Sequence, residues 1–517
     1  GYTLETVLKD GEEFWLKPTA NLSTGGTATD VTDKVHPSNI FMCERIARII
    51  GLDICGIDIM ADNLTQPITE TGGAILEVNA APGFRMHLDP TEGIGRNVAE
   101  PVIDMLYPPG ASARIPIIAV SGTNGKTTTT RLIAHIVKQM GYKVGFTTTE
   151  GVYIQNQMMM QGDCTGPVSA EFVLKDPTVE YAVLESARGG ILRAGLGFHN
   201  CDMAVITNIA PDHLGLNGID TLEQLARTKA VVARSVFPEG YVILNADDDL
   251  VYKMREDVDC KVALFSLDEN NPRIKEHSAN NGISCVYENG YFTILKGTWK
   301  IRVDKVSNAP ITFGGKAEFN IQNALGAILA AYLRDFKIED IKLALETFVP
   351  SPVQTPGRMN IFNFKNFTVM ADYAHNAHGM RAIGKFVNKV EATKKVGVIA
   401  GVGDRRDEDT IELAEEAARV FDEIVIRQDK HLRGRTEQEI IDLLTRGIKN
   451  IKPDMKITTM KKESEAIDYA IRNAAKGSFI VVINDVVLAA LDQLQRLKEE
   501  EDNGSPIRID TITDWVI

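Results

Sequence analysis

The stretch from residue 115 to residue 130, IPIIAVSGTNGKTTTT, constrains the fold of this chain more than any other. Its apolar start, residues 115–120, predicts a buried strand, and the apolar side chains after Thr127 recur at helical spacing. A glycine loop between a strand and a helix N-terminus is an anion site, because its backbone N–H groups and the helix dipole both favour negative charge. Gly122 and Gly125 let the backbone approach a phosphate closely. The stretch therefore predicts a phosphate-binding loop inside an α/β domain.

The loop differs from the usual Walker sequence at one position. Val120 stands where the first glycine of G-x-x-x-x-G-K-[ST] would fall. The short motif at residues 122–127, GTNGKT, instead resembles the loop of the Mur ligase superfamily. Lys126 is then expected to reach the β- and γ-phosphates of ATP, and Thr127 to offer its hydroxyl to Mg²⁺. The nucleotide-binding residues that we predict in this loop are Gly122, Thr123, Asn124, Gly125, Lys126, Thr127 and Thr128.

Length, charge and cysteine content exclude several classes of protein. A length of 517 residues predicts about three domains. The sequence has no run of ~18 apolar residues and no signal-peptide pattern at its polar N-terminus. Its six cysteines form no C-x-x-C pair, which argues against a zinc site and fits a reducing cytoplasm, and its net charge of −14 argues against general nucleic-acid binding. We therefore expect a cytoplasmic protein without a membrane or nucleic-acid partner.

Residues 1–110 form the first predicted domain. A helix over about 37–50 is followed by two strand-like segments, one with Asp58 and the next with Glu77 and Asn79, and we also expect a strand at residues 14–17. Hard oxygen ligands on neighbouring strands suit a Mg²⁺–nucleotide complex, although two strands with ordinary acidic ends would look the same.

These elements resemble the C-terminal half of an ATP-grasp domain, an α+β unit. The resemblance implies that Asp58, Glu77 and Asn79 bind metal and that the turn-rich residues 21–26 form a substrate and phosphate loop. No first half of such a fold precedes them, so we expect the unit to be incomplete. The breaker-rich run YPPGAS at residues 107–112 predicts a domain boundary.

Residues 111–352 form the second predicted domain, around the phosphate-binding loop. Glu185 follows an apolar strand at residues 181–184, and His213 lies in a polar cluster after a strand at residues 203–206. In an open parallel sheet, ligands bind at the carboxyl ends of the strands. We therefore expect both side chains to converge on the pocket of Thr127, where a carboxylate and an imidazole suit Mg²⁺ or Mn²⁺. A capped helix with a packed histidine is the alternative interpretation of His213.

The next segments extend this domain. A helix over 222–235 carries Lys229, which by its position alone is typical of a solvated helix face. Residues 260–315 alternate apolar and polar with Gly and Asn turns, which predicts antiparallel strands beside the core sheet. A further helix opens with Asn320 and Asn323, a pair that a helix N-cap would also explain.

The order of these motifs resembles that of Mur ligase central domains: GTNGKT, a strand-end Glu, TNIAPDHLG, a helical Lys and ILNADD. The resemblance implies that Glu185 and His213 bind metal and that Lys229, carbamylated in many members, helps to hold a second Mg²⁺. It also implies that Asn208 lies by the nucleotide. Asn320 and Asn323 are, by the same resemblance, candidates for contact near the adenine.

Residues 353–517 form the third predicted domain. Strands at residues 367–371, 396–400, 423–426 and 479–483 alternate with helical stretches, which predicts a parallel, Rossmann-like α/β sheet. The segment resembles the Mur ligase C-terminal domain, whose Arg and Asp, here Arg358 and Asp372, contact ATP when the domain closes. Such closure excludes water from an acyl phosphate. The loop at residues 427–435 lies where Mur ligases select the amino acid, and it lacks the D-N-P-R run of the diamino-acid-adding members.

An ATP-grasp half joined to a complete Mur ligase unit resembles the cyanophycin synthetase family. The strings NLSTGGTA at residues 21–28 and GFRMHL at residues 83–88 carry this resemblance. It implies ATP and Mg²⁺ as cofactors and three substrates: a cyanophycin or poly-aspartate primer, L-arginine and L-aspartate. The Mur-like unit would join arginine to an aspartate β-carboxylate, and the ATP-grasp unit would add aspartate to the backbone. It also implies a homo-oligomer, a dimer or a tetramer.

Two alternatives stay open from the sequence. One is another Mur-type ligase, of the peptidoglycan or folylpolyglutamate kind, but those have no ATP-grasp half, so residues 1–110 argue against it. A nucleotide-binding scaffold that holds polymer without turnover is the alternative from a different class, and the incomplete first domain is its best support.

Overall fold

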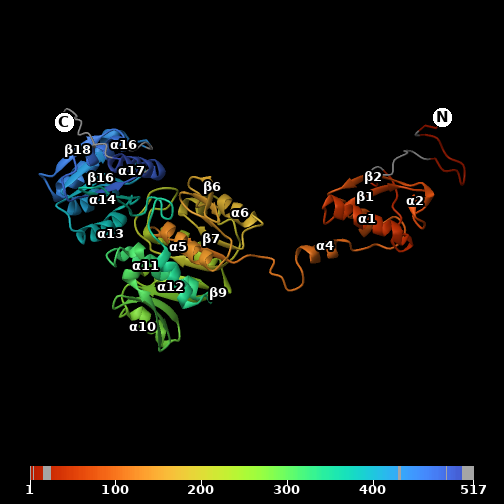
Figure 1. The fold of residues 1–517 in the computed structure, drawn as a ribbon, viewed down its shortest axis with the longest axis horizontal. Helices are drawn as coiled ribbons and strands as arrows, with labels where there is room; N and C mark the ends of the chain where they lie inside the picture. Colours follow the sequence, from red (N-terminus) through yellow and green to blue (C-terminus); the bar gives the residue numbers. More distant parts are fainter. Residues whose placement is uncertain are drawn as a thin grey trace. The chain divides into compact units, whose positions relative to one another are not determined.

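A computed structural model describes residues 2–503 apart from residues 4, 15–21, 23–24, 429–431, 433 and 485. The chain divides into two compact units, Gly1–Arg114 and Ile115–Ile517 (Figure 1). The predicted strand at 14–17 and the predicted loop at 21–26 lie largely outside the described residues.

The first unit is built on one helix and a two-stranded sheet. Helix α1 (Pro37–Ile50) begins with a proline in its first turn and ends at Gly51, which adopts a left-handed φ of 81°. Strands β1 (Gly56–Met60) and β2 (Ala74–Asn79) pair antiparallel. The predicted helix and both predicted strands are thus confirmed. Short helices complete the unit: η2 (Thr32–Lys34), α2 (Ile68–Thr71), α3 (Arg85–Leu88) and α4 (Ala99–Leu106).

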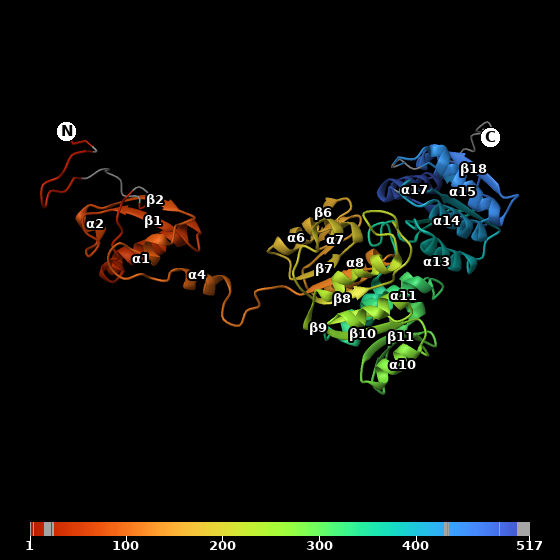
Figure 2. The same ribbon diagram turned by 180° about the vertical axis from the view of Figure 1, so that it is seen from behind.

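An eleven-stranded sheet forms the first half of the second unit, in the order β13-β12-β11-β10-β9-β8-β3-β7-β4-β5-β6. Figure 2 labels its strands from β6 to β11. The central strands from β11 to β4 run parallel, and antiparallel strands lie at both ends. The strands are β3 (Ile117–Ser121), β4 (Val144–Thr147), β5 (Gly151–Ile154), β6 (Gln157–Gln161), β7 (Tyr181–Glu185), β8 (Cys201–Ile206), β9 (Val236–Asn245), β10 (Lys261–Ser266), β11 (Ile283–Glu288), β12 (Tyr291–Lys296) and β13 (Trp299–Lys305).

Helices cover both faces of this sheet, because its parallel strands are apolar on both sides. One hydrophobic core joins the sheet to α5 (Lys126–Gln139), α11 (Glu318–Tyr332) and α12 (Ile338–Thr347). A second core joins the other face to α6 (Pro167–Lys175), α8 (Leu222–Arg234), α9 (Asp249–Lys253) and α10 (Pro272–Ala279). Helix α7 (Arg188–Ala194) follows β7 directly.

The prediction of antiparallel strands over residues 260–315 was wrong for its first half. Strand β10 pairs in parallel with β9 and with β11, and α10 forms the crossover between β10 and β11. The local sequence signals this helix, because Asn271 caps it and Pro272 occupies its first turn. The expected antiparallel hairpins are formed by β12 with β11 and by β12 with β13.

A six-stranded sheet forms the rest of the second unit, in the order β14-β15-β19-β16-β17-β18. All neighbours are parallel except β14 and β15, so the predicted parallel α/β sheet is confirmed, while edge strands β14 and β18 were not predicted. The strands are β14 (Asn360–Asn363), β15 (Thr368–Asp372), β16 (Lys394–Ile399), β17 (Glu423–Arg427), β18 (Lys456–Met460) and β19 (Ser478–Ile483). Helices α13 (Ala377–Asn388), α14 (Asp407–Val420) and α15 (Glu437–Ile451) pack on one face, and α16 (Glu463–Arg472) and α17 (Val487–Asp502) on the other.

Candidate active site

The predicted phosphate-binding loop connects buried strand β3 to the N-terminus of α5. Gly122 and Gly125 adopt φ values of 141° and 84°, a region that side chains rarely occupy. A Cβ on Gly122 would clash with the Thr207 hydroxyl, and one on Gly125 would clash with the Asn323 amide. Both positions therefore require glycine, for backbone conformation and for space.

Asn208 holds the loop in this shape. Its Oδ1 accepts a hydrogen bond from the Asn124 backbone N (2.9 Å), and its Nδ2 donates to the Asn124 carbonyl (3.0 Å). The Asn208 carbonyl accepts from the backbone N of Thr123 (2.8 Å). The structure thus places the predicted nucleotide neighbour Asn208 directly on the loop.

Glu185 at the end of β7 lies beside the first turn of α5. The Thr127 hydroxyl donates to Glu185 Oε2 (2.9 Å), and the Thr149 hydroxyl donates to Oε1 (3.2 Å). Burial raises the pKa of Glu185, and the nearby Lys126 ammonium opposes this shift. A buried carboxylate among hydroxyl groups is a donor set that suits a hard divalent cation. The structure brings the predicted ligands Thr127 and Glu185 together.

Lys126 and Lys229 both donate to carbonyls of the loop. Lys126 Nζ lies 2.9 Å from the Thr123 carbonyl, and Lys229 Nζ lies 2.7 Å from the Gly122 carbonyl. Lys229 is only 4% exposed, so its interpretation as a solvated residue is wrong. Burial, aided by the Lys126 charge, lowers the pKa of Lys229 to about 7. Lys229 is thus a buried amine directly under the phosphate loop.

His213 belongs to a second cluster, shared with the C-terminal sheet. His213, Asp212 and His375 offer ligand atoms within 4.8 Å of one another. Arg405 follows β16 and bridges this cluster, with Nη2 lying 2.9 Å from Asp212 Oδ1 and Nη1 lying 2.5 Å from His213 Nδ1. Burial lowers the pKa of His213 to about 3, which keeps its imidazole neutral. His213 therefore contacts Arg405, and its Nδ1 lies 3.4 Å from Asp404 Oδ2. We had expected this imidazole to lie beside Glu185.

Two predicted residues of the C-terminal domain lie close to the loop in different ways. Arg358 Nη2 lies 3.4 Å from the Thr127 hydroxyl and 3.0 Å from Glu150 Oε1. Asp372 is buried at the end of β15, where it accepts from the backbone N of Met359 (2.9 Å), and burial raises its pKa. Arg358 thus reaches the loop itself, and Asp372 holds the backbone of the residue next to it.

The asparagine pair lies inside α11. Asn323 Nδ2 donates to Asn320 Oδ1 (3.2 Å), and Asn320 Nδ2 donates to the Ile311 carbonyl (2.9 Å). The N-cap of the helix is Ala317, without a side-chain cap, so the interpretation of the pair as a cap is wrong. Asn323 lies against Gly125, as the clash described above shows. Thr128 is buried in the first turn of α5.

The three metal ligands predicted in the first unit are gathered on its small sheet. Asp58 on β1 lies opposite Glu77 on β2 in the antiparallel register. Asn79 Nδ2 donates to Glu77 Oε1 (3.3 Å). Asp58 and Glu77 are exposed, so they leave room for a ligand.

Sequence reasoning missed several residues that contact the loop cluster. Thr149 and Glu150 directly follow β4 in the string TTTE, and a strand-end position was the signal that could have found them. Asn376 exchanges amide hydrogen bonds with Asn124 (3.1 and 3.2 Å), across 252 residues of sequence. No local pattern predicts such a contact.

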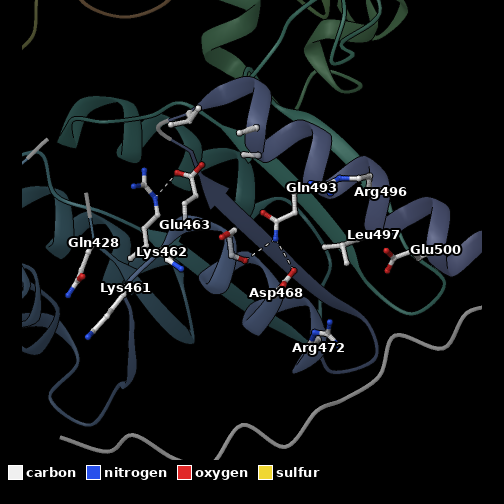
Figure 3. Close-up of a pocket in the computed structure, with 15 residues that line it drawn as sticks. Gln428, Lys461, Lys462, Glu463, Asp468, Arg472, Gln493, Arg496, Leu497 and Glu500 are labelled. Atoms are coloured by element: carbon white, nitrogen blue, oxygen red, sulfur yellow. Dashed lines mark hydrogen bonds and ion pairs between the residues drawn. The ribbon is translucent and has the colours of Figure 1, made fainter. Parts of the chain in front are cut away.

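A cavity of about 600 Å³ lies elsewhere in the C-terminal domain, between α16, α17 and the carboxyl ends of β17 and β18 (Figure 3). Arg427 and Gln428, the first residues of the predicted selectivity loop, line it. Arg427 Nε pairs with Glu463 (3.0 Å). Gln493 donates to Asp468 (2.8 Å), as Figure 3 shows. The cavity is therefore polar, with charges of both signs.

Comparison with known proteins defines the class first. Residues 120–331 match the Mur ligase middle domain, and residues 357–488 match the Mur ligase glutamate ligase domain. The chain belongs to the Mur ligase family. Among solved structures, E. coli FolC in complex with DHPP and ADP shares the fold, with a TM-score of 0.54, 18% identity and coverage of 75% of this chain and 89% of FolC.

The chain is a homologue of cyanophycin synthetase. It is 50% identical over 496 residues to the cyanophycin synthetase of Geminocystis herdmanii and 50% identical over 498 residues to that of Synechocystis sp.. Each alignment covers 96% of this chain and 57% of the relative, so the chain spans a little over half the length of these relatives. Within the part of the chain that the structure describes, no helix is both long and apolar enough to cross a membrane.

Proposed function

We propose that this chain carries an ATP-dependent ligase that joins L-arginine to the β-carboxylate of aspartate in a cyanophycin or poly-aspartate primer. The observation that supports it best is the cluster of Lys126, Thr127, Glu185 and Lys229 on one glycine loop, in a chain 50% identical to cyanophycin synthetases. The E. coli FolC structure, which shares this fold, was solved with ADP, in keeping with a nucleotide-binding protein.

The chemistry follows from charge. A carboxylate is a poor electrophile, so ATP transfers its γ-phosphoryl group to it and leaves as ADP. The neutral α-amine of arginine then attacks the acyl carbon, the C–O bond to the phosphate breaks, and inorganic phosphate and a proton are released. Lys126 and the loop N–H groups stabilise charge that develops on the transferred phosphoryl group. Thr127, Glu185 and the carbamate of Lys229 would hold Mg²⁺, which would supply further charge neutralisation. His213 would join them only after leaving its contacts with Arg405 and Asp404. No covalent bond to the protein is required.

The C-terminal domain would close over the loop during this reaction. Arg358 reaches Thr127, and Asn376 pairs with Asn124, so the two domains of the second unit already meet at the phosphate site. Closure would exclude water, which otherwise hydrolyses an acyl phosphate. The loop at residues 427–435 would select the incoming amino acid, and Asn320 and Asn323 would lie near the adenine.

The remaining assignments belong to the same proposal. We place domains at residues 1–110, 111–352 and 353–517. The first would be the C-terminal part of an ATP-grasp unit that adds L-aspartate to the backbone, with Asp58, Glu77 and Asn79 at its Mg²⁺. The protein would work in the cytoplasm as a homo-oligomer.

Release of ADP tests this function against its alternatives. ADP should form when ATP, Mg²⁺, arginine and an aspartate-ended primer are all present, and mass analysis should show arginine added to the primer. Turnover with a peptidoglycan precursor or a folate and glutamate, but not with arginine, would favour another Mur-type ligase. Nucleotide binding without turnover would favour a scaffold.

A further inference from the structure

Glu150 lies between two arginines that come from different parts of the second unit. Its Oε2 lies 3.5 Å from Arg131 Nη2, and its Oε1 lies 3.0 Å from Arg358 Nη2. The Glu150 side chain is 5% exposed, that of Arg131 is 4% exposed and that of Arg358 is 18% exposed. Glu150 thus bridges two guanidinium groups with its carboxylate, and the three side chains are largely buried.

Arg131 is the fixed end of this bridge. It lies on α5, one helical turn after Thr127, and its Nη2 donates to the Tyr153 hydroxyl (2.8 Å). Its guanidinium also stacks over the Tyr153 ring at 4.6 Å and over the Phe146 ring at 5.6 Å. These contacts hold Arg131, and through it Glu150, rigidly to the helix of the phosphate loop.

Arg358 is the end of the bridge that reaches the site. It precedes β14, at the start of the C-terminal domain, and its Nη2 also lies 3.4 Å from the Thr127 hydroxyl. Its guanidinium packs over the Tyr373 ring at 4.8 Å. The ion pair with Glu150 holds Nη2 of this guanidinium next to the first turn of α5.

We propose that Glu150 is a positioning residue for nucleotide binding, which holds the Arg358 guanidinium beside Thr127 when the C-terminal domain closes. The inference rests on the proposed function, because it takes the loop as the site of the ATP phosphates. Glu150 itself points at two guanidinium groups and acts on the phosphate only through Arg358. Its negative charge also balances Arg131, so that Arg358 can approach without repulsion.

Glu150→Gln tests this role, because it keeps the shape of the side chain and removes its charge. We expect the variant to bind the non-hydrolysable analogue β,γ-methylene-ATP about 10- to 100-fold more weakly, the usual range for loss of one charged hydrogen bond. The KM for ATP should rise by a similar factor. Calorimetry measures the binding without any acceptor, so a failure of the proposed ligase reaction would not disturb this test.

A double-variant cycle separates positioning from a general structural effect. In an Arg358→Met background, Glu150→Gln should weaken binding by less than about 2-fold, because the residue through which it acts is gone. The matched control is Glu423→Gln, another buried carboxylate between two cations, Lys394 and Lys456, at the amino end of β17. This control should bind the analogue as the wild type does.

Two results would overturn the proposal. The first is that Glu150→Gln weakens binding of the analogue equally in the wild-type and Arg358→Met backgrounds. The second is that Glu150→Gln leaves the affinity unchanged and only lowers the melting temperature, the result that a purely structural residue such as Glu423 would give. If Glu150→Gln alone does not fold because Arg131 is left buried and unpaired, the double variant Arg131→Met, Glu150→Gln removes both charges. It should fold and show the same weakened binding, and wild-type affinity in it would contradict the role.

Discussion

At the scale of single residues, Lys126 has the most direct predicted role. Lys126→Ala should lower arginine-dependent ADP release by at least ~10²-fold, because one electrostatic stabiliser of the transition state is lost. Lys138→Ala, at the exposed last turn of the same helix, is the control and should keep wild-type turnover. Near-normal turnover in Lys126→Ala would remove this lysine from the mechanism.

Lys229 should make stability depend on pH in a definite direction. Burial lowers its pKa to about 7, so between pH 7 and its ordinary value of 10.5 the unfolded chain binds a proton that the folded chain does not. Unfolding free energy then rises with pH in this window, by up to about 1.4 kcal/mol per pH unit. Lys229→Met lacks this pH dependence. The unfolding free energy of the wild type should therefore increase relative to that of the variant as the pH rises from 7 to 9.5.

Thermal unfolding of both proteins across that range measures the effect, without nucleotide. The buffers must be free of CO₂, because a neutral lysine amine reacts with it. Parallel pH profiles for the two proteins would show that Lys229 titrates normally.

At the scale of elements, helix α5 offers a matched pair of glycines. Gly125 precedes it with a φ of 84°, and Gly141 follows it with a φ of 89°. A Cβ on Gly141 would meet no atom within 4 Å, whereas one on Gly125 would strike Asn323. Gly141→Ala should therefore cost about 1–2 kcal/mol of stability and leave ATP binding intact. Gly125→Ala should abolish ATP binding as well; equal affinities in a calorimetric titration of the two variants would contradict this.

The elements also show how far the sequence could lead. Strand–loop–helix order around residues 115–130 was predictable, because apolar runs, glycines and helical spacing are local signals. The crossover at β10 and β11 was missed, because strand direction depends on distant partners and alternation alone does not reveal it. Edge strands β14 and β18 were missed because they depend on pairing with their neighbouring strands, which the local sequence does not reveal.

The site divides in the same way. Thr127 and Glu185 could be gathered from the sequence, because one opens the helix after the loop and the other ends a strand. Lys229 was placed there only by the resemblance to Mur ligases, because its helical position alone indicated a solvated side chain. The partners of His213 could not, because Arg405 and His375 come from another sheet. Contacts between domains depend on how the domains pack, which no local pattern encodes.

At the scale of the whole molecule, the two units differ in how much core they bury. The eleven-stranded sheet, the six-stranded sheet and four hydrophobic clusters lie in the second unit. Among the described residues of the first unit, Ile68 is the only buried apolar side chain, and α1 exposes Phe41 and Ile49. The second unit therefore has the hydrophobic burial that independent folding requires, and the first has very little.

A protein of residues 111–517 should consequently fold alone and keep arginine-dependent ADP release with an aspartate-ended primer, within about 3-fold of the full chain if the units act separately. Residues 1–110 alone should show no cooperative thermal transition, because one buried side chain cannot offset the conformational entropy of the chain. Circular dichroism melting and ADP release measure both outcomes, and Lys126→Ala in the shorter protein supplies the inactive control. Loss of turnover in a well-folded 111–517 protein would show that arginine addition depends on the first unit, which the separate cores give no reason to expect.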